Sequence, residues 1–307
     1  MHPKPDAAFG WSDVFMLGIT VVWGLNFSLI KIALREMSPE GFNGLRLVLT
    51  AVLFLVLLKL SGQGFRLGRG DLWKLALIGI MGNAIYQVLF IGGLNRTTAS
   101  NTSFILSISP VIVALLSGVF RIERIHWAAW MGIFISVAGL YFVISGNGGF
   151  RLSSDSFRGD LMILAGTFLW SVYTVFSKGF LERMSPLKFA AITVSFGSLA
   201  YLPFSAGAMA RIPWTRISFK SWAALAFSAA FSLVIGYLIW YSSVRRVGNA
   251  RTAVYSNLTP VFTALFASIF LGESLGPRQI FGAAVILAGV YLTRAGYRYF
   301  IRVRDAV

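Results

Sequence analysis

Apolar residues fill long blocks of this chain, and short polar stretches separate the blocks. Ten blocks are long enough to cross a lipid bilayer, which takes roughly 20 apolar residues. They lie at about 13–33, 41–60, 74–94, 99–120, 127–146, 160–180, 188–206, 221–243, 252–272 and 279–296. Since no water is present in a bilayer core to satisfy backbone groups, each block is expected to form a helix. The pattern predicts an all-α integral membrane protein with ten transmembrane helices.

The chain also repeats itself. Residues 23–42 read WGLNFSLIKIALREMSPEGF, and residues 170–189 read WSVYTVFSKGFLERMSPLKF. A second pair of segments, 110–141 and 260–291, shares Pro, Glu, Gly and Tyr positions in register. We therefore predict two related five-helix halves, at 13–150 and 158–297, with cytoplasmic tails at 1–12 and 298–307.

Five helices per half have a consequence for direction. A unit with an odd number of crossings places its second copy in the membrane upside down. The prediction is a 5+5 inverted-topology repeat around a central cavity, the arrangement that lets transporters open a site to each side in turn.

Composition agrees with a membrane protein and limits its chemistry. Hydrophobic residues make up 57% of the 307 residues and charged residues 12%, whereas soluble domains carry about 25% charged residues. Cysteine is absent and there are two histidines, so we expect no metal site and no cofactor. No serine–histidine–aspartate set or phosphate-binding loop is apparent, so an enzyme is not expected.

The net charge of +16 belongs to the loops. The N-terminus, the even-numbered loops and the C-terminus hold about twice as many Lys and Arg residues as the odd-numbered loops. The positive-inside rule then places both termini in the cytoplasm of a bacterial cell, with the chain in the inner membrane. The partner of these basic loops is the lipid bilayer and not nucleic acid.

The W…K…(M/S)P spacing at 23–39 and 170–186 resembles EamA-type proteins of the drug/metabolite transporter superfamily. So does the proline–apolar–Glu…Gly…Ala-Gly–Tyr pattern of 110–141 and 260–291. The resemblance covers about residues 10–296, and it is greatest to the bacterial aromatic amino-acid exporter branch. It implies a basket whose third, fourth, eighth and ninth helices form the main cavity walls. The first, second, sixth and seventh helices would contribute, and the fifth and tenth would lie at the periphery.

Polar and aromatic residues in the middle of helices are candidates to bind substrate. Polar groups that face lipid are costly, so these faces should turn inward. Aromatic rings with hydroxyl and amide groups suit an amphiphilic organic solute. The alternatives are an interfacial aromatic belt or ordinary helix packing. The candidates are Trp23, Asn26, Asn83, Tyr86, Gln87, Phe90, Ser107, Trp170, Tyr173, Tyr237, Trp240, Tyr241, Tyr255 and Asn257.

Three cations and two prolines are candidates for gating or hinge roles. Lys31 and Lys178 recur, each seven residues before a Ser-Pro pair; they either reach the interface or hold a substrate carboxylate or a gate. Arg46 is a similar cation without a counterpart in the second half. Pro110 and Pro260 should kink the fourth and ninth helices near their middles. The two alternatives are kinked, discontinuous helices that line the cavity and act as hinges, or ordinary packing kinks.

Acidic residues suggest how flux is driven. Glu123 and Glu273 each follow a proline by thirteen residues and should cap the next helix, or form a gate ion pair with a neighbouring Arg. Every carboxylate lies at a helix end or in a loop, whereas proton-coupled transporters usually hold one near the bilayer centre. Strong proton coupling is therefore not expected.

These observations predict an exporter that works by alternating access on small molecules, with aromatic and other hydrophobic amino acids as the leading substrates. The alternatives are export of nucleosides, cationic compounds or other metabolites, or a membrane scaffold or receptor without transport. Gly132, Gly139, Gly282 and Gly289 should allow close helix approach within one chain, and a monomer or weak dimer is expected.

Overall fold

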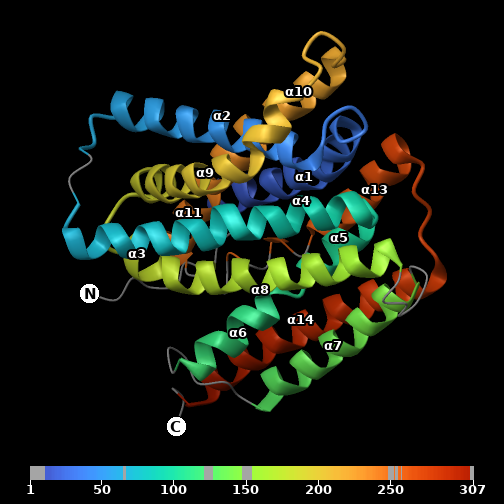
Figure 1. Cartoon of the computed structure of the whole chain (residues 1–307). Helices are drawn as coiled ribbons and strands as arrows, with labels where there is room; N and C mark the ends of the chain where they lie inside the picture. The colour runs from blue at the N-terminus through green and yellow to red at the C-terminus, as the bar shows by residue number, and fades with distance from the viewer. Residues whose placement is uncertain are drawn as a thin grey trace.

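The computed structural model describes residues 11–64, 67–120, 127–146, 154–247, 252, 255–256 and 258–304. Their secondary structure is helical, without a strand among the described residues. The helices are α1 (Trp11–Ala33), α2 (Pro39–Leu60), α3 (Arg69–Ile80), α4 (Tyr86–Arg96), α5 (Ala99–Leu106), α6 (Ser109–Val119), α7 (Trp127–Gly146), α8 (Asp155–Leu181), α9 (Pro186–Ala210), α10 (Phe219–Phe227), α11 (Gly236–Val247), α13 (Thr259–Leu271) and α14 (Pro277–Arg304) (Figure 1).

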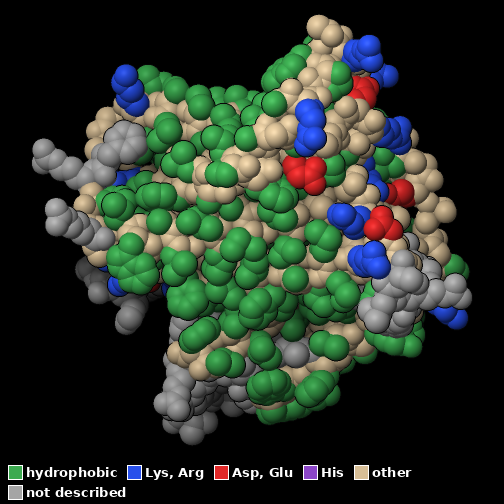
Figure 2. Space-filling model, in the orientation of Figure 1, with side chains coloured by type: hydrophobic (Ala, Val, Ile, Leu, Met, Phe, Trp, Pro, Cys, Tyr) green, Lys and Arg blue, Asp and Glu red, His purple; other side chains and the backbone are tan. Residues whose placement is uncertain are grey.

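Six helical stretches of the described chain are long and apolar enough to cross a membrane. They run over Val14–Ala33, Pro39–Leu60, Gly70–Arg96, Asp155–Leu181, Pro186–Ala210 and Phe219–Arg246. Figure 2 shows hydrophobic side chains over the broad middle of one face, while Lys, Arg, Asp and Glu gather mainly along one edge. An apolar belt with charges at its rim is typical of a protein that sits in a bilayer.

The predicted fourth helix is not a single kinked helix. It is divided into α5 and α6, with Ser107 and Ile108 between them. Pro110 is the second residue of α6, and Pro260 likewise lies in the first turn of α13. The predicted discontinuity is thus present, as a break rather than a kink through the proline: a proline needs no N–H at a helix start, so both prolines open a new segment.

Two helical stretches contain π-helical turns. The stretch from α3 to α4 includes η1 (Met81–Ile85), and the stretch from α10 to α11 includes η2 (Ser228–Ile235). A π turn disturbs the backbone hydrogen-bond ladder and frees carbonyls for other partners. In η2 the carbonyl of Ser232 accepts a hydrogen bond from the indole Nε1 of Trp23, 3.0 Å away on α1. The irregular turn thereby ties two helices together.

Small residues let helices approach closely. A Cβ added at Gly139 of α7 would lie 2.6 Å from the backbone nitrogen of Ile286 on α14, and one added at Gly282 would lie 2.7 Å from the carbonyl oxygen of Gly139. A Cβ at Gly289 would similarly meet the Gly132 carbonyl at 2.6 Å. The predicted close approach within one chain is therefore present, and α7 and α14 lie side by side at one edge of the bundle (Figure 1).

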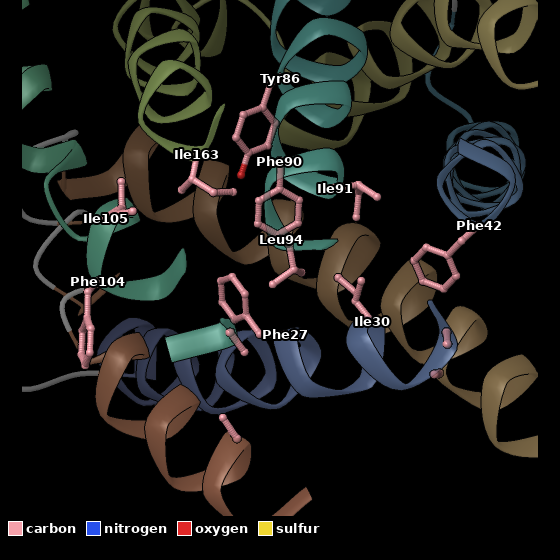
Figure 3. Close-up of a cluster of buried hydrophobic side chains, with 14 of the residues drawn as sticks. Phe27, Ile30, Phe42, Tyr86, Phe90, Ile91, Leu94, Phe104, Ile105 and Ile163 are labelled. Atoms are coloured by element: carbon pink, nitrogen blue, oxygen red, sulfur yellow. The ribbon is translucent and has the colours of Figure 1, made fainter. Parts of the chain in front are cut away.

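Three clusters of buried hydrophobic side chains hold the described helices together, and two of them are large. One joins α1, α4, α5 and α8 through side chains that include Phe27, Phe90 and Ile163. Figure 3 shows Tyr86 and Phe90 on successive turns of α4, with Phe27 of α1 across from them. The other cluster packs α2 against α9 around Phe54, Phe189 and Tyr241. A cavity lies where the first cluster meets the second.

Candidate functional site

A central cavity of about 130 Å³ lies among helices from across the sequence. Its lining comes from α1, α2, α4, α5, α6, α8, η2, α11 and α13. Nine of the predicted binding residues line it: Trp23, Asn26, Tyr86, Gln87, Phe90, Ser107, Trp170, Tyr237 and Trp240. The described residues of α7, α9 and α14 contribute none. The expected contribution of the seventh helix, α9, is therefore not found.

Aromatic rings form a nearly continuous wall. Trp170 is central: its ring centroid lies 5.3 Å from that of Tyr86, 5.6 Å from Tyr237 and 6.5 Å from Trp240. Trp240 in turn lies 5.6 Å from the ring of Trp23. Rings at such separations stabilise one another beyond their buried area. They hold a rigid apolar surface that suits a flat ligand.

Polar atoms without a partner interrupt this wall. Asn26 Oδ1, Thr174 Oγ1, Trp240 Nε1 and Thr259 Oγ1 all line the cavity, are buried, and lack a hydrogen-bond partner among the described residues. A buried polar atom left unpaired costs about 1–3 kcal/mol. Such atoms gathered around one space indicate a site whose hydrogen bonds are completed by a bound molecule or by water.

Arg46 lies in the cavity lining rather than at a helix end. It is fully buried in α2, and Asn43 one turn earlier accepts from its Nε at 3.1 Å and from its Nη2 at 2.7 Å. Gln87 Oε1 accepts from Nη2 at 2.5 Å, and Ser228 Oγ accepts from Nη1 at 3.0 Å. Every one of these acceptors is neutral.

Four predicted binding residues lie outside the cavity. Tyr173 is fully buried between α8, α9 and α11, where its hydroxyl lies 3.1 Å from Thr193 Oγ1 and 2.7 Å from Tyr241 Oη. Asn83 lies against α9, since a Cβ added at Gly197 of α9 would lie 2.4 Å from the Cβ of Asn83.

Tyr255 packs against the cluster between α2 and α9. The described lining of the cavity therefore leaves out Tyr173, Tyr241, Asn83 and Tyr255, and their role in substrate binding stays a prediction. Asn257 lies outside the described residues.

Several lining residues were not predicted as substrate-binding. They are Phe27, Ser103, Leu106, Ser109, Val113, Thr174, Ser232, Leu233, Ser256 and Thr259. A signal existed for two of them: Phe27 is four residues after Trp23, and Thr174 is four residues after Trp170, so each shares a helix face with a tryptophan. Ser232 and Leu233 carry no such signal, because π-helical turns alter the register of their stretch.

One end of the bundle is joined by polar contacts. We call it the Glu273 end: α1, α4 and α13 finish there, and α5, α8 and α14 begin. Lys31 Nζ donates to the carbonyl of Thr97 at 2.6 Å. The hydroxyl of Thr97 donates to Asp160 Oδ1 at 2.5 Å, and Asn101 accepts from Gln279 Nε2 at 2.6 Å. These bonds connect α1, α4, α5, α8 and α14.

Glu273 caps a different helix from the expected one. Its carboxylate accepts from the backbone nitrogens of Ala99 at 2.8 Å and Ser100 at 3.1 Å, and from Ser100 Oγ at 2.8 Å. These groups open α5, whereas the N-terminus of α14 is capped by Gln279, which accepts from Gly276 N at 2.9 Å. Capping of the next helix was thus a wrong prediction for Glu273. The sharp turn at Gly272, with φ of 68°, redirects the chain.

Asp160 and Glu36 are further acidic groups at this end. Asp160 is 1% exposed and lies in the second turn of α8, so the expectation that every carboxylate lies at a helix end or in a loop does not hold for it. Glu36, in the turn after α1, accepts from the backbone nitrogen of Ser218 at 2.7 Å. Hydrogen bonds from the Ser218 backbone, then from the Ser218 and Ser221 side chains, hold the pKa of Glu36 below its ordinary value.

Lys178 and Glu123 are the predicted gating and capping residues that remain. Lys178 is half-buried near the end of α8, and the described residues provide no hydrogen bond or ion pair for its ammonium group. Glu123 lies outside the described residues. At the opposite end, Arg183 and Asp71 form an exposed ion pair at 3.3 Å.

The sequence profile of the EamA-like transporter family matches residues 10–145 and again residues 157–295. The chain belongs to the EamA-like transporter family. It is a transporter rather than an enzyme, and the cavity among its helices is the candidate site of this EamA-like transporter.

Relatives of this EamA-like transporter carry transporter names. A transporter of Archaeoglobus fulgidus is 30% identical over 90% of this chain and 96% of its own length. The Bacillus subtilis transporter YyaM is 27% identical over 92% of this chain and 93% of its own. A "probable terminal-alkyne amino-acid exporter" of Streptantibioticus cattleyicolor is 27% identical, over 91% and 92%. One solved crystal structure shares the fold, with a TM-score of 0.65 at 20% identity over 93% of this chain and 98% of that one.

Proposed function

We propose that this EamA-like transporter exports amino acids, aromatic and other hydrophobic ones above all, or closely related small metabolites. The observation that carries the proposal is the cavity wall, in which flat aromatic rings alternate with unpartnered polar atoms. A cavity of about 130 Å³ is smaller than the pockets of roughly 300–1,000 Å³ that hold drug-sized molecules. A relative named as an amino-acid exporter supports the same class.

The mechanism we propose is alternating access between two inverted five-helix halves, 13–150 and 158–297, with ten membrane crossings in all. The family profile matches once in each half. The π-helical stretches are also in register: η1 begins 58 residues after Trp23, and η2 begins 58 residues after Trp170. Exchange of conformations between two such halves would move the cavity opening from one side of the membrane to the other.

The packing of the halves supports this mechanism. In the first half Gly24 of α1 approaches Phe262 of α13 so closely that a Cβ would lie 2.5 Å from the phenylalanine Cβ. In the second half Ser171 of α8, at the position equivalent to Gly24, has its Oγ 2.9 Å from Ser109 Oγ on α6. Each first helix thus contacts the segment that contains the proline of the other half. When one of these two helix contacts opens, the equivalent contact in the other half would close.

We further propose that both termini are cytoplasmic in a bacterial inner membrane. The Glu273 end would then face the outside, and its hydrogen bonds would hold the cavity closed on that side. Flux would follow the solute gradient without strong proton coupling, because the described lining of the cavity contains no carboxylate.

The test is efflux from liposomes that contain the purified protein and radiolabelled phenylalanine, leucine or a nucleoside. We expect protein-dependent efflux of the amino acids, at rates that a pH gradient leaves within about twofold. Efflux of the nucleoside alone would contradict the substrate class. Binding of amino acids without efflux would instead favour a receptor, and an absolute requirement for a proton gradient would contradict uncoupled flux.

A further inference from the structure

Arg46 carries a positive charge that the described residues do not neutralise. Its four hydrogen bonds go to the side-chain oxygens of Asn43, Gln87 and Ser228, all of them neutral. The ion pairs of the described chain are Arg96 with Asp155 and Arg183 with Asp71, both near helix ends. A buried charge is costly unless an opposite charge or several hydrogen bonds compensate it. Here the hydrogen bonds are in place and the opposite charge is missing.

The guanidinium is also held in a fixed position. Asn43 and Gln87 bring acceptors to it from α2 and α4, and Ser228 does so from η2. The ring of Phe42 lies 5.7 Å from its central carbon. A guanidinium has five N–H groups in a rigid planar fork, and these contacts use four of them. One N–H and the whole charge therefore remain for a molecule in the cavity that Arg46 lines.

The rest of the cavity defines what such a molecule would look like. The described lining contains no Asp or Glu, so an organic cation would meet a like charge and no counter-charge. Trp170, Tyr86 and Trp240 line the cavity with aromatic surface that can contact an apolar body. An ammonium group can also lie over such rings, and the unpartnered Asn26 Oδ1 can accept a hydrogen bond from it.

We infer that Arg46 anchors the carboxylate of the transported solute, so that a carboxylate is an obligatory part of the substrate and an ammonium group is not. This inference rests on the proposed function of the same cavity and narrows it. Aromatic and hydrophobic amino acids fit, and so do the corresponding carboxylic acids that lack the amino group. Amides, amines and nucleosides, which lack a carboxylate, do not fit.

The experiment compares three molecules that share one phenyl body. Phenylalanine has both charged groups, 3-phenylpropanoate has the carboxylate alone, and phenylalanine amide has the ammonium alone. Each is measured by thermal stabilisation of the purified protein and by competition against radiolabelled phenylalanine in liposomes. Charge-assisted hydrogen bonds of this kind change affinity by roughly tenfold to a hundredfold. We expect the amide to bind that much more weakly than the other two molecules.

The variants test whether Arg46 is the cause. Arg46→Gln should remove the preference, so that phenylalanine and its amide bind equally, while Arg46→Lys should retain part of it. Arg183→Gln, which removes an exposed arginine at the other end of the bundle, is the matched control and should leave the preference unchanged. Because Arg46 connects three helical stretches, Arg46→Gln is first checked for a single peak in gel filtration. If it does not fold, the three ligands on the unaltered protein decide.

The outcomes separate the two proposals. An amide that binds as well as phenylalanine overturns the role of Arg46 while amino-acid export stands. Stabilisation by 3-phenylpropanoate without transport of any amino acid supports the carboxylate site and contradicts the proposed function. Stabilisation by none of the three molecules overturns the carboxylate site.

Discussion

We expect Glu273→Gln to open the Glu273 end of the bundle. The carboxylate accepts three hydrogen bonds from the start of α5, at 2.8, 3.1 and 2.8 Å. Glutamine keeps one acceptor oxygen and loses the charge. A negative charge near a helix N-terminus contributes about 0.3–1 kcal/mol, and a hydrogen bond to a charged group exceeds a neutral one by about 1 kcal/mol. The combined loss is about 1–2 kcal/mol, a factor of roughly 5–30 in an equilibrium constant.

This loss should appear mainly in the conformational equilibrium. Glu273 joins two segments that are 173 and 174 residues apart in the chain, and we propose that they separate when this end opens. The population with an open Glu273 end should therefore rise roughly 5–30-fold. The stability of the open state relative to the unfolded chain should not change, because the state in which this end is open lacks these bonds already.

The absence of cysteine from the natural chain gives a clean assay. A single cysteine placed at Thr174, which lines the cavity on α8, would report access through its rate of reaction with a membrane-impermeant maleimide. We expect Glu273→Gln to raise this rate 5–30-fold when the reagent is added on the Glu273 side. Asp71→Asn breaks the exposed ion pair at the other end and is the control, with no increase from the Glu273 side.

Two results would contradict a closing role for Glu273. An unchanged rate in a folded Glu273→Gln protein would show that the cap does not contribute to closure. Equal increases from both sides of the membrane would indicate general loosening of the bundle rather than the release of one gate.

Three further outcomes are expected. Gly139→Ala places a methyl group 2.6 Å from the backbone of Ile286, so it should destabilise the α7–α14 contact by about 1–3 kcal/mol and lower the thermal midpoint in detergent; Gly18→Ala, with nothing within 4 Å, should not. Trp240→Phe removes an unpartnered donor, so the empty protein should keep or gain stability while phenylalanine binds several-fold more weakly. A loss of both stability and affinity would mean that Trp240 acts through the packing of its ring and not through its N–H group. Asp160→Asn should lower the thermal stability because it weakens the hydrogen bond from Thr97, and efflux should not respond to a pH gradient in either protein. If efflux by the unaltered protein does respond to a pH gradient and the Asp160→Asn variant loses that response, Asp160 is a coupling group.

The helices followed from local pattern. Apart from the breaks beside Pro110 and Pro260, the predicted apolar blocks are helical over nearly all of their described residues, since a long apolar run has few other ways to satisfy its backbone in lipid. Close packing of α7 against α14 also followed, because glycines at two-turn spacing form a flat strip wherever they occur. The sequence located the irregularities beside Pro110 and Pro260, but it does not reveal whether a helix bends and continues through a proline or ends and starts again there.

The site was predicted in part, and the reason is visible in one pair of residues. Asn26 and Tyr173 occupy equivalent positions, three residues after Trp23 and Trp170. In the folded protein the tyrosine reaches Thr193 and Tyr241 and fills its space, whereas the asparagine is short and leaves its side-chain oxygen in the cavity lining. Only the packing of neighbouring helices decides which of two similar faces is filled and which is hollow.

A helical membrane transporter with a repeated pattern and an excess of positive charge could be inferred from the sequence alone, because composition and period are local properties. The tertiary structure decided the electrostatics of the site. It brought Arg46 next to Gln87 and Ser228, which are 41 and 182 residues away, and left it without a described acidic partner. It also directed Glu273 to the start of α5, more than 170 residues earlier in the chain. Contacts over such separations depend on how whole helices pack, and no short stretch of sequence encodes them.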